Sequence, residues 1–168
     1  SSYVTGLAHA DSSHISAAYD RQLIWWDRDN GKQLRSVEAH QRWIRQLIIT
    51  PDQQQAITVA DDMACRIWDV KTGKLIRELR GHQEKTPHHF PSMLYACAVS
   101  SDGKYLATGD RVGHVVVWDL ASGKELATLE TPIMYTWDPK ARIHSIGGIR
   151  SLAFSADSTR LAVGGTGK

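Results

Sequence analysis

The last seven residues of the chain are the first candidate for chemistry. Ala162 to Lys168 reads "AVGGTGK", which is close to the glycine-rich loop that cradles a nucleotide phosphate with backbone N–H groups and a lysine. That motif has Gly, often Ala, then four free residues, Gly-Lys and a Ser or Thr, and the chain ends before the last position. A phosphate loop must also open a helix, whose N-terminus presents the N–H groups. The neighbouring elements therefore decide this question.

Histidines and cysteines are the other candidates. A metal site would have to be built from His82, His88, His89 and His144. The adjacent His88 and His89 should point in different directions, and no carboxylate or cysteine is spaced to complete a ligand set, so no metal is expected. Two cysteines, Cys65 and Cys97, lie in apolar runs and are expected to be small buried hydrophobes. No Ser-His-Asp or Cys-His arrangement stands out, so neither a catalytic residue nor a cofactor is predicted.

Three stretches of the chain repeat one pattern. They are "WDRDNGKQL" from Trp26, "WDVKTGKLI" from Trp68 and "WDLASGKEL" from Trp118, at intervals of 68 − 26 = 42 and 118 − 68 = 50 residues. Upstream of each Trp-Asp the sequences also align, with one deletion near Ser12. Repeats with periods of this size indicate a repeat architecture.

Each repeat is expected to hold four short strands. Apolar runs bounded by the turn-forming segments "PDQQ", "DDMA" and "VKTG" indicate these strands in the second repeat. There the strands are expected at about Ile44–Thr50, Ala56–Ala60, Cys65–Asp69 and Leu75–Leu79.

Gly81-His82 near the start of a repeat, together with Trp-Asp at the end of each third strand, resembles the WD40-repeat family of β-propellers. The resemblance implies an all-β fold, a propeller segment of four-stranded antiparallel blades around a channel. The implied blades span about 3–37, 40–79 and 82–129, with half of a fourth at about 144–168 after a long loop, 130–148.

The resemblance also implies a buried hydrogen-bond chain in each blade. It runs from a histidine before the first strand, through a Ser or Thr on the second strand, to the tryptophan of the third strand, and an aspartate holds the histidine. The second repeat has the complete set: His40, Thr58, Asp62 and Trp68. A fully satisfied network fixes one arrangement of buried polar groups, so these residues are expected to be structural.

The other repeats have incomplete sets. The third has His82, Thr108 and Trp118, but Val112 stands where the aspartate belongs, which puts its network in doubt. The first has Ser16, Asp20 and Trp26, and its histidine would lie before Ser1.

The fourth repeat settles the phosphate-loop question. "IRSLAFSADSTRLAVGG" from Ile149 matches the first half of a repeat, and "LAVGGTGK" aligns with "LATGDRVG" of the third. The next element should be a strand, so no nucleotide site is expected. Three and a half repeats fall short of the usual propeller of about 4–8 blades. We expect a piece of a longer propeller; a chain that closes by dimerisation and a short protein are the alternatives.

Two inserted loops are candidates for partner binding. They are "QEKTPHHFPSM" after His82 and "ETPIMYTWDPKARIHSIGG" before the fourth repeat. Long loops on a rigid repeat scaffold commonly carry recognition. Their candidate contact residues are Phe90, Tyr135, Trp137, Arg142 and His144. A second candidate group, Arg42, Trp43 and Arg45, could meet an acidic peptide or a phosphate. The alternative for the first group is that its aromatic residues pack the loops onto the scaffold. The alternative for the second group is that its members are ordinary residues of a blade rim.

Composition limits the function classes. The chain has 168 residues, of which 42% are hydrophobic, and a net charge of +2. No basic stripe or membrane-spanning run appears, which disfavours nucleic acid and membrane partners. No signal peptide starts the chain; the compartment stays open, with a cytoplasmic one favoured. We expect a non-enzymatic scaffold that binds a protein or peptide and needs further blades or a second copy. The alternative is a regulatory propeller of a larger enzyme.

Overall fold

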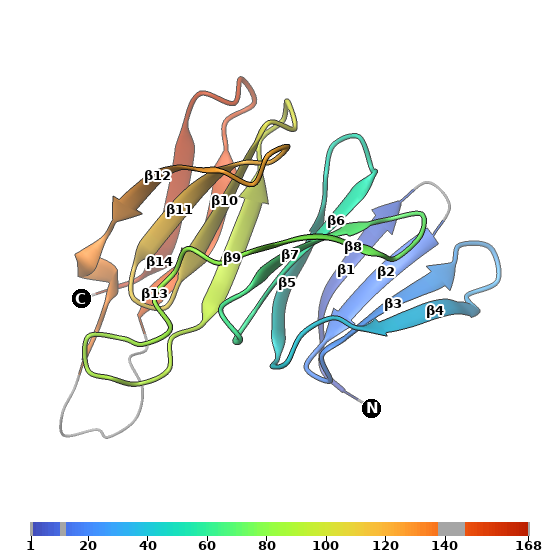
Figure 1. Cartoon of the computed structure of the whole chain (residues 1–168), viewed down its shortest axis with the longest axis horizontal. Coiled ribbons are helices and arrows are strands. Elements are labelled where there is room, and N and C mark those ends of the chain that lie inside the picture. The colour runs from blue at the N-terminus through green and yellow to red at the C-terminus, as the bar shows by residue number, and fades with distance from the viewer. Residues whose placement is uncertain (1, 11–12, 138–146, 168) are drawn as a thin grey trace. The chain divides into compact units, whose positions relative to one another are not determined.

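The computed structural model describes residues 2–10, 13–137 and 147–167. The chain divides into two compact units, Ser1–Arg80 and Gly81–Lys168. Figure 1 shows strands throughout both units. The described part of the chain also contains one short 3-10 helix, η1 (Pro132–Met134).

Two four-stranded antiparallel sheets make up the first unit. In each sheet the strands follow in chain order, β1-β2-β3-β4 and β5-β6-β7-β8. Their bounds are β1 Val4–Ala10, β2 Ser13–Ala18, β3 Gln22–Asp27, β4 Gln33–Glu38, β5 Ile44–Ile49, β6 Gln55–Ala60, β7 Cys65–Asp69 and β8 Leu75–Leu79.

The second unit holds one four-stranded sheet and one hairpin. The sheet order is β12-β11-β10-β9, and β13 pairs antiparallel with β14. Their bounds are β9 Leu94–Val99, β10 Tyr105–Asp110, β11 His114–Asp119, β12 Glu125–Glu130, β13 Gly148–Phe154 and β14 Leu161–Thr166.

The repeated Gly-Lys pairs form the turns between third and fourth strands. Gly31, Gly73 and Gly123 all have positive φ, between 68° and 74°. Only glycine adopts this left-handed conformation without steric cost. The aspartate of each Trp-Asp closes the turn: the glycine N–H donates to the backbone oxygen of that aspartate at 2.8–3.0 Å. The repeated motif therefore specifies a hairpin.

The core of the first unit lies between its two sheets. One face of the first sheet, with Ile15, Leu23 and Trp25, packs against Ile44 and Trp68 of the second. The Trp25 indole N–H also donates to the backbone oxygen of Val70 at 2.9 Å. Alternation along β2 and β3 produces this face, because successive side chains of a strand point to opposite sides.

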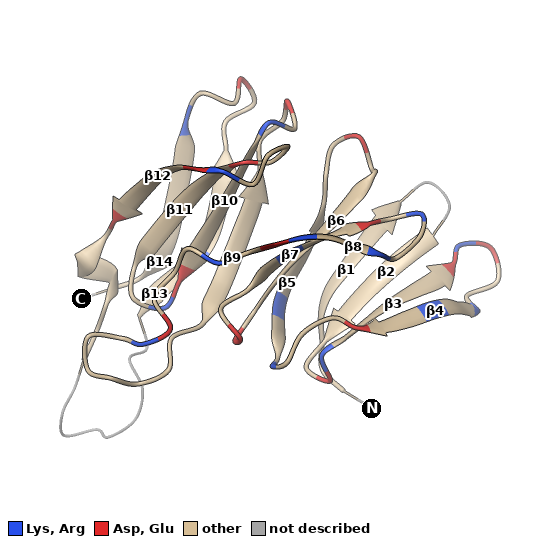
Figure 2. Ribbon diagram, viewed as in Figure 1, with Lys and Arg blue, Asp and Glu red and all other residues tan. Residues whose placement is uncertain are grey.

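The second unit is built in the same way. Ile149 of β13 is fully buried against Ala96, Ala107 and Val115 of the β9–β12 sheet. Gly109 permits this contact, because a Cβ there would lie 2.5 Å from an Ile149 methyl carbon. Lysine, arginine, aspartate and glutamate are interspersed along each unit (Figure 2).

The predicted fold class, all-β with four-stranded antiparallel sheets, is confirmed. The glycine-rich segment at the end of the chain belongs to β14, which pairs with β13 through Thr166. It therefore opens no helix in the described residues, and Lys168 lies outside them. In the described part, no helix is long and apolar enough to span a membrane.

Candidate functional site

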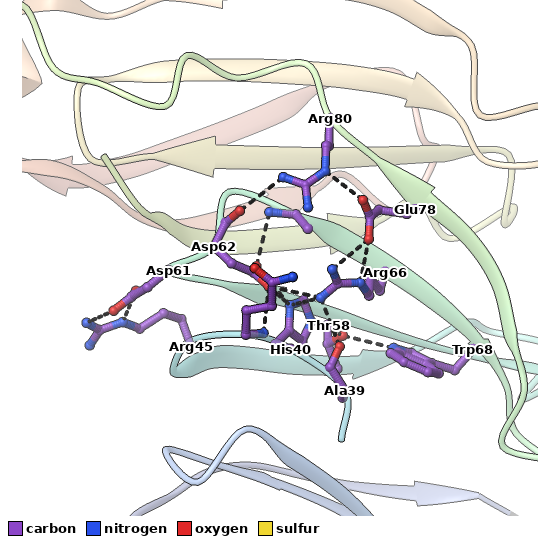
Figure 3. A network of polar contacts seen from close by, with 12 residues as sticks. Ala39, His40, Arg45, Thr58, Asp61, Asp62, Arg66, Trp68, Glu78 and Arg80 are labelled. Carbon is purple, nitrogen blue, oxygen red and sulfur yellow. Dashed lines mark hydrogen bonds and ion pairs between the residues drawn. The ribbon is translucent and has the colours of Figure 1, made fainter. Parts of the chain in front are cut away.

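The β5–β8 sheet contains a buried chain of hydrogen bonds (Figure 3). The Nδ1 atom of His40 lies 3.0 Å from Asp62, and its Nε2 atom lies 2.7 Å from the Thr58 hydroxyl. The Trp68 indole N–H donates to the same hydroxyl oxygen at 2.9 Å. The sequence named these four residues, and the structure brings all of them together.

The protonation of this chain follows from its burial. Desolvation of the buried ring, reinforced by the Arg66 charge and opposed by Asp62, lowers the pKa of His40. Desolvation also acts on Asp62, but hydrogen bonds from His40, the Gln41 N–H and Arg66 outweigh it and hold the pKa of Asp62 well below its usual range. A neutral His40 can donate from Nδ1 to Asp62 and accept the Thr58 hydroxyl at Nε2.

A buried arginine extends this network. The Arg66 guanidinium donates to the backbone oxygen of Ala39 and to Asp62, both at 2.9 Å, and to Glu78 at 2.7 Å. Arg80 also donates to Glu78 at 2.6 Å (Figure 3). Sequence reasoning missed Arg66. The sequence did contain a signal for it: a charged residue stands in the third strand of the second repeat, at the position where the first and third repeats have Ile24 and Val116.

The network of the third repeat corrects one expectation. His82 does have a carboxylate partner, but it comes from Asp110, whose Oδ2 atom lies 3.0 Å from Nδ1. The Oδ1 atom of Asp110 accepts the N–H groups of Val112 and His114, both at 2.9 Å. Asp110 is fully buried at the end of β10. Its carboxylate therefore holds the histidine, as the aspartate of the second repeat does, although it lies two residues before Val112 in the sequence. The doubt drawn from Val112 alone was therefore misplaced.

The rest of this third network matches the second. Thr108 lies 2.8 Å from the Nε2 atom of His82 and accepts the Trp118 indole N–H at 2.9 Å. Gly81 allows the Trp118 ring to lie close to the backbone, where a Cβ would collide with it. In the first repeat, the Trp26 indole N–H donates to Ser16 at 2.8 Å, and Asp20 accepts the Gln22 N–H in its own turn.

At one end of the first unit three aromatic rings lie in a row, and an arginine lies beside two of them. Tyr19 stacks on Trp43, with ring centroids 4.6 Å apart, and Tyr3 lies 5.9 Å from Tyr19. Arg45 lies 5.4 Å from the Tyr19 centroid and 5.5 Å from the Trp43 centroid. Two bonds of 2.6 and 2.7 Å join its guanidinium to Asp61. We call Tyr3, Tyr19, Trp43 and Arg45 the aromatic surface.

Sequence reasoning named part of the aromatic surface. Trp43 and Arg45 were candidates, and neighbouring Arg42 is exposed. Tyr3, Tyr19 and Asp61 were missed. Tyr19 lies directly after β2, in the turn between second and third strands, a type of turn that the resemblance places on the same face as the loops.

The two inserted loops of the second unit contact each other through their rings. His88 stacks on Trp137 at 4.2 Å and bonds to the Tyr135 hydroxyl at 2.8 Å. Phe90 lies 5.1 Å from Trp137 and stays 46% exposed. The structure therefore brings Phe90, Tyr135 and Trp137 together, whereas Arg142 and His144 lie outside the described residues.

The described residues contain no group of three or more metal-ligating side chains. Burial raises the pKa of the Cys65 thiol, which disfavours the reactive thiolate. Cys97 is buried and free as well.

Known proteins resemble this chain in sequence. The family described as "WD domain, G-beta repeat" matches residues 31–69 and 73–119, just over half of the chain. Human U3 small nucleolar RNA-interacting protein 2 is 35% identical over 99 residues, covering 56% of this chain and 21% of that protein. Nuclear distribution protein PAC1 of Arthroderma benhamiae is 29% identical over 140 residues, covering 74% and 30%.

A longer relative also matches. Apoptotic protease-activating factor 1 of Rattus norvegicus is 27% identical over 155 residues, covering 92% of this chain and 11% of that protein. The chain thus spans less than a third of each of these three relatives. With the repeated Trp-Asp hairpins and the family match, the conclusion is that this chain belongs to the WD40-repeat family.

Proposed function

We propose that this chain is a non-enzymatic scaffold that presents loops to a protein or peptide partner. In this proposal each repeat is one blade, at about 3–37, 40–79 and 82–129, and 144–168 is half of a fourth. The histidine-to-tryptophan networks hold the second and third blades rigid. The loop residues at the blade ends carry the binding.

The exposed aromatic surface of the first unit supports this proposal most strongly. Trp43 is 50% exposed and Tyr3 is 79% exposed, although both belong to a packed row of rings. The Arg45 guanidinium, paired with Asp61, lies against the Tyr19 and Trp43 rings. Rigid tryptophan, tyrosine and arginine side chains dominate the binding energy of protein interfaces, since little entropy is lost when they bind.

The charges indicate the chemistry of the partner. Asp61 neutralises Arg45, so Arg45 orders the rings and is not the main attraction for a ligand. Exposed Arg42, directly beside Trp43, adds positive charge at the edge of the row. An acidic peptide with an apolar or aromatic anchor would place its anchor on Trp43 and a carboxylate near Arg42.

A peptide-library selection on the purified chain tests this function. Selected peptides should contain an acidic residue near an apolar anchor and should bind Trp43→Ala at least tenfold more weakly. Arg42→Ala should weaken binding with a smaller salt dependence. Leu126→Ala, at an exposed apolar position of β12 in the second unit, is the matched control and should keep full affinity. Peptides that bind Trp43→Ala as tightly as the wild type would refute this surface.

A second candidate is a regulatory propeller of a larger enzyme. The rat relative supports the larger chain that this candidate requires, because 92% of the present chain matches only 11% of that protein. The sequence that flanks these repeats in the full-length protein would distinguish the two candidates: a catalytic domain favours the second, and more repeats favour a pure scaffold.

Binding of nucleic acid is a further outcome that can be tested. The human relative is named as RNA-interacting, whereas this chain has a net charge of only +2. A salt series with single-stranded RNA would show a steep loss of affinity if phosphates were contacted.

A further inference from the structure

Two histidines face each other across the first hairpin, where the other sheets have apolar residues. His9 of β1 pairs with His14 of β2, and His14 lies opposite Trp26 of β3. Beside the corresponding Trp68, the β5–β8 sheet has Ile49 and Ala56. Beside Trp118, the β9–β12 sheet has Val99 and Leu106.

Packing does not account for this histidine pair. Ala56 and Leu106 are completely buried, and Ile49 packs against the core of its unit. His9 is instead exposed and His14 half-buried. A polar pair at a register position that is otherwise apolar departs from the local folding pattern, and such departures tend to mark functional sites.

The geometry of the pair suits a shared ligand. The two Nδ1 atoms lie 3.1 Å apart, and the ring centroids 4.9 Å apart. A transition-metal ion bonds imidazole nitrogen at about 2.0–2.1 Å, so two nitrogens 3.1 Å apart would subtend about 100° at the ion. This angle lies between those of octahedral and tetrahedral coordination. Opposite residues of an antiparallel pair share one face of the sheet, so small rotations would direct both nitrogens at one ion.

We propose that His9 and His14 form a two-imidazole chelate for a late first-row divalent cation such as Zn²⁺, Ni²⁺ or Cu²⁺. Neutral imidazole is a preferred ligand of these ions, and Cu²⁺ should bind most tightly. Water takes the remaining coordination positions because the pair is open to solvent, so the bound ion exchanges readily. The site is independent of the aromatic surface, which uses other residues.

Isothermal titration of the chain with Ni²⁺ and with Zn²⁺, without a polyhistidine tag, tests the proposal. We expect one ion per chain at pH 7.5. Either His9→Gln or His14→Gln should weaken binding by about tenfold or more, since each removes one of two ligands. Affinity should also fall at pH 5, because protons compete for the imidazole nitrogens. The matched control, His88→Gln, removes an exposed histidine of the second unit and should change nothing.

Three results would overturn the chelate. One is no binding at millimolar metal, and another is binding that survives both His9→Gln and His14→Gln. The third is binding that His88→Gln weakens as much as they do. Circular dichroism of each variant shows whether the sheets are intact, and both substitutions replace side chains outside the buried core. In a folded variant, lost affinity therefore reports on the ligand.

Discussion

Removing one buried hydroxyl tests the hydrogen-bond chain of the second repeat. Thr58→Val keeps the shape of the side chain but deletes the oxygen that accepts the Trp68 N–H at 2.9 Å and lies 2.7 Å from the His40 Nε2 atom. Thr58 is completely buried, and both partners are at most 5% exposed. Water therefore cannot replace the lost partner without a rearrangement.

The expected loss follows from those two contacts. Each buried polar group left without a partner costs about 1–3 kcal/mol. The added methyl group returns about 0.8 kcal/mol. Together these values give a loss of about 1–5 kcal/mol, centred near 3 kcal/mol, in the free energy of unfolding.

Chemical denaturation gives the overall change, and amide hydrogen exchange in β5–β8 and in β9–β12 locates it. Thr108→Val is the matched variant, because Thr108 makes the same two contacts in the second unit. It should lower protection in β9–β12 by a similar amount. Thr128→Val, at an exposed position of β12, should have little effect. If Thr58→Val stays within about 0.5 kcal/mol of the wild type, the hydrogen-bond chain does not stabilise the sheet as argued.

Three further predictions follow from the same structure. Because the pKa of His40 is lowered from 6.5 in the folded chain, the unfolded state binds the proton first as pH falls through 6.5. The free energy of unfolding should then fall by at most about 1.4 kcal/mol for each pH unit. Denaturation at pH 7.5 and at pH 5 should show a smaller difference in this free energy for His40→Gln than for the wild type. An equal difference in both proteins would contradict the lowered pKa of His40. Asp110→Ala should cost about 2–4 kcal/mol in thermal or chemical unfolding, because it leaves His82 and two backbone N–H groups without their acceptor, whereas Val112→Ala should cost less. Trp137→Ala should speed amide exchange at residues 86–92 with little change in β9–β12, since its ring packs on His88 and Phe90; equal exchange in both proteins would show that the ring does not hold the loop.

Local patterns in the sequence determined much of this protein. Alternating apolar residues and the Trp-Asp…Gly-Lys hairpins determine the strands and their order, because hairpin pairing depends on residues that are near one another in the chain. The second-repeat expectations, Cys65–Asp69 and Leu75–Leu79, coincide with β7 and β8. His40, Thr58, Asp62 and Trp68 could be named because each occupies a fixed position in a repeated pattern.

Tertiary structure decided what depends on side-chain reach and on contacts between distant segments. Asp110 takes over a role that simple alignment assigned to the position of Val112, because its carboxylate reaches His82 from two residues earlier. Tyr19 and Trp43 are 24 residues apart and stack only because two loops meet at one end of the first unit. The His9–His14 pair likewise depends on strand register, since a shift of one residue would place the two rings on opposite faces. The sequence alone thus determined the repeats and strands, and the folded chain determined which side chains meet.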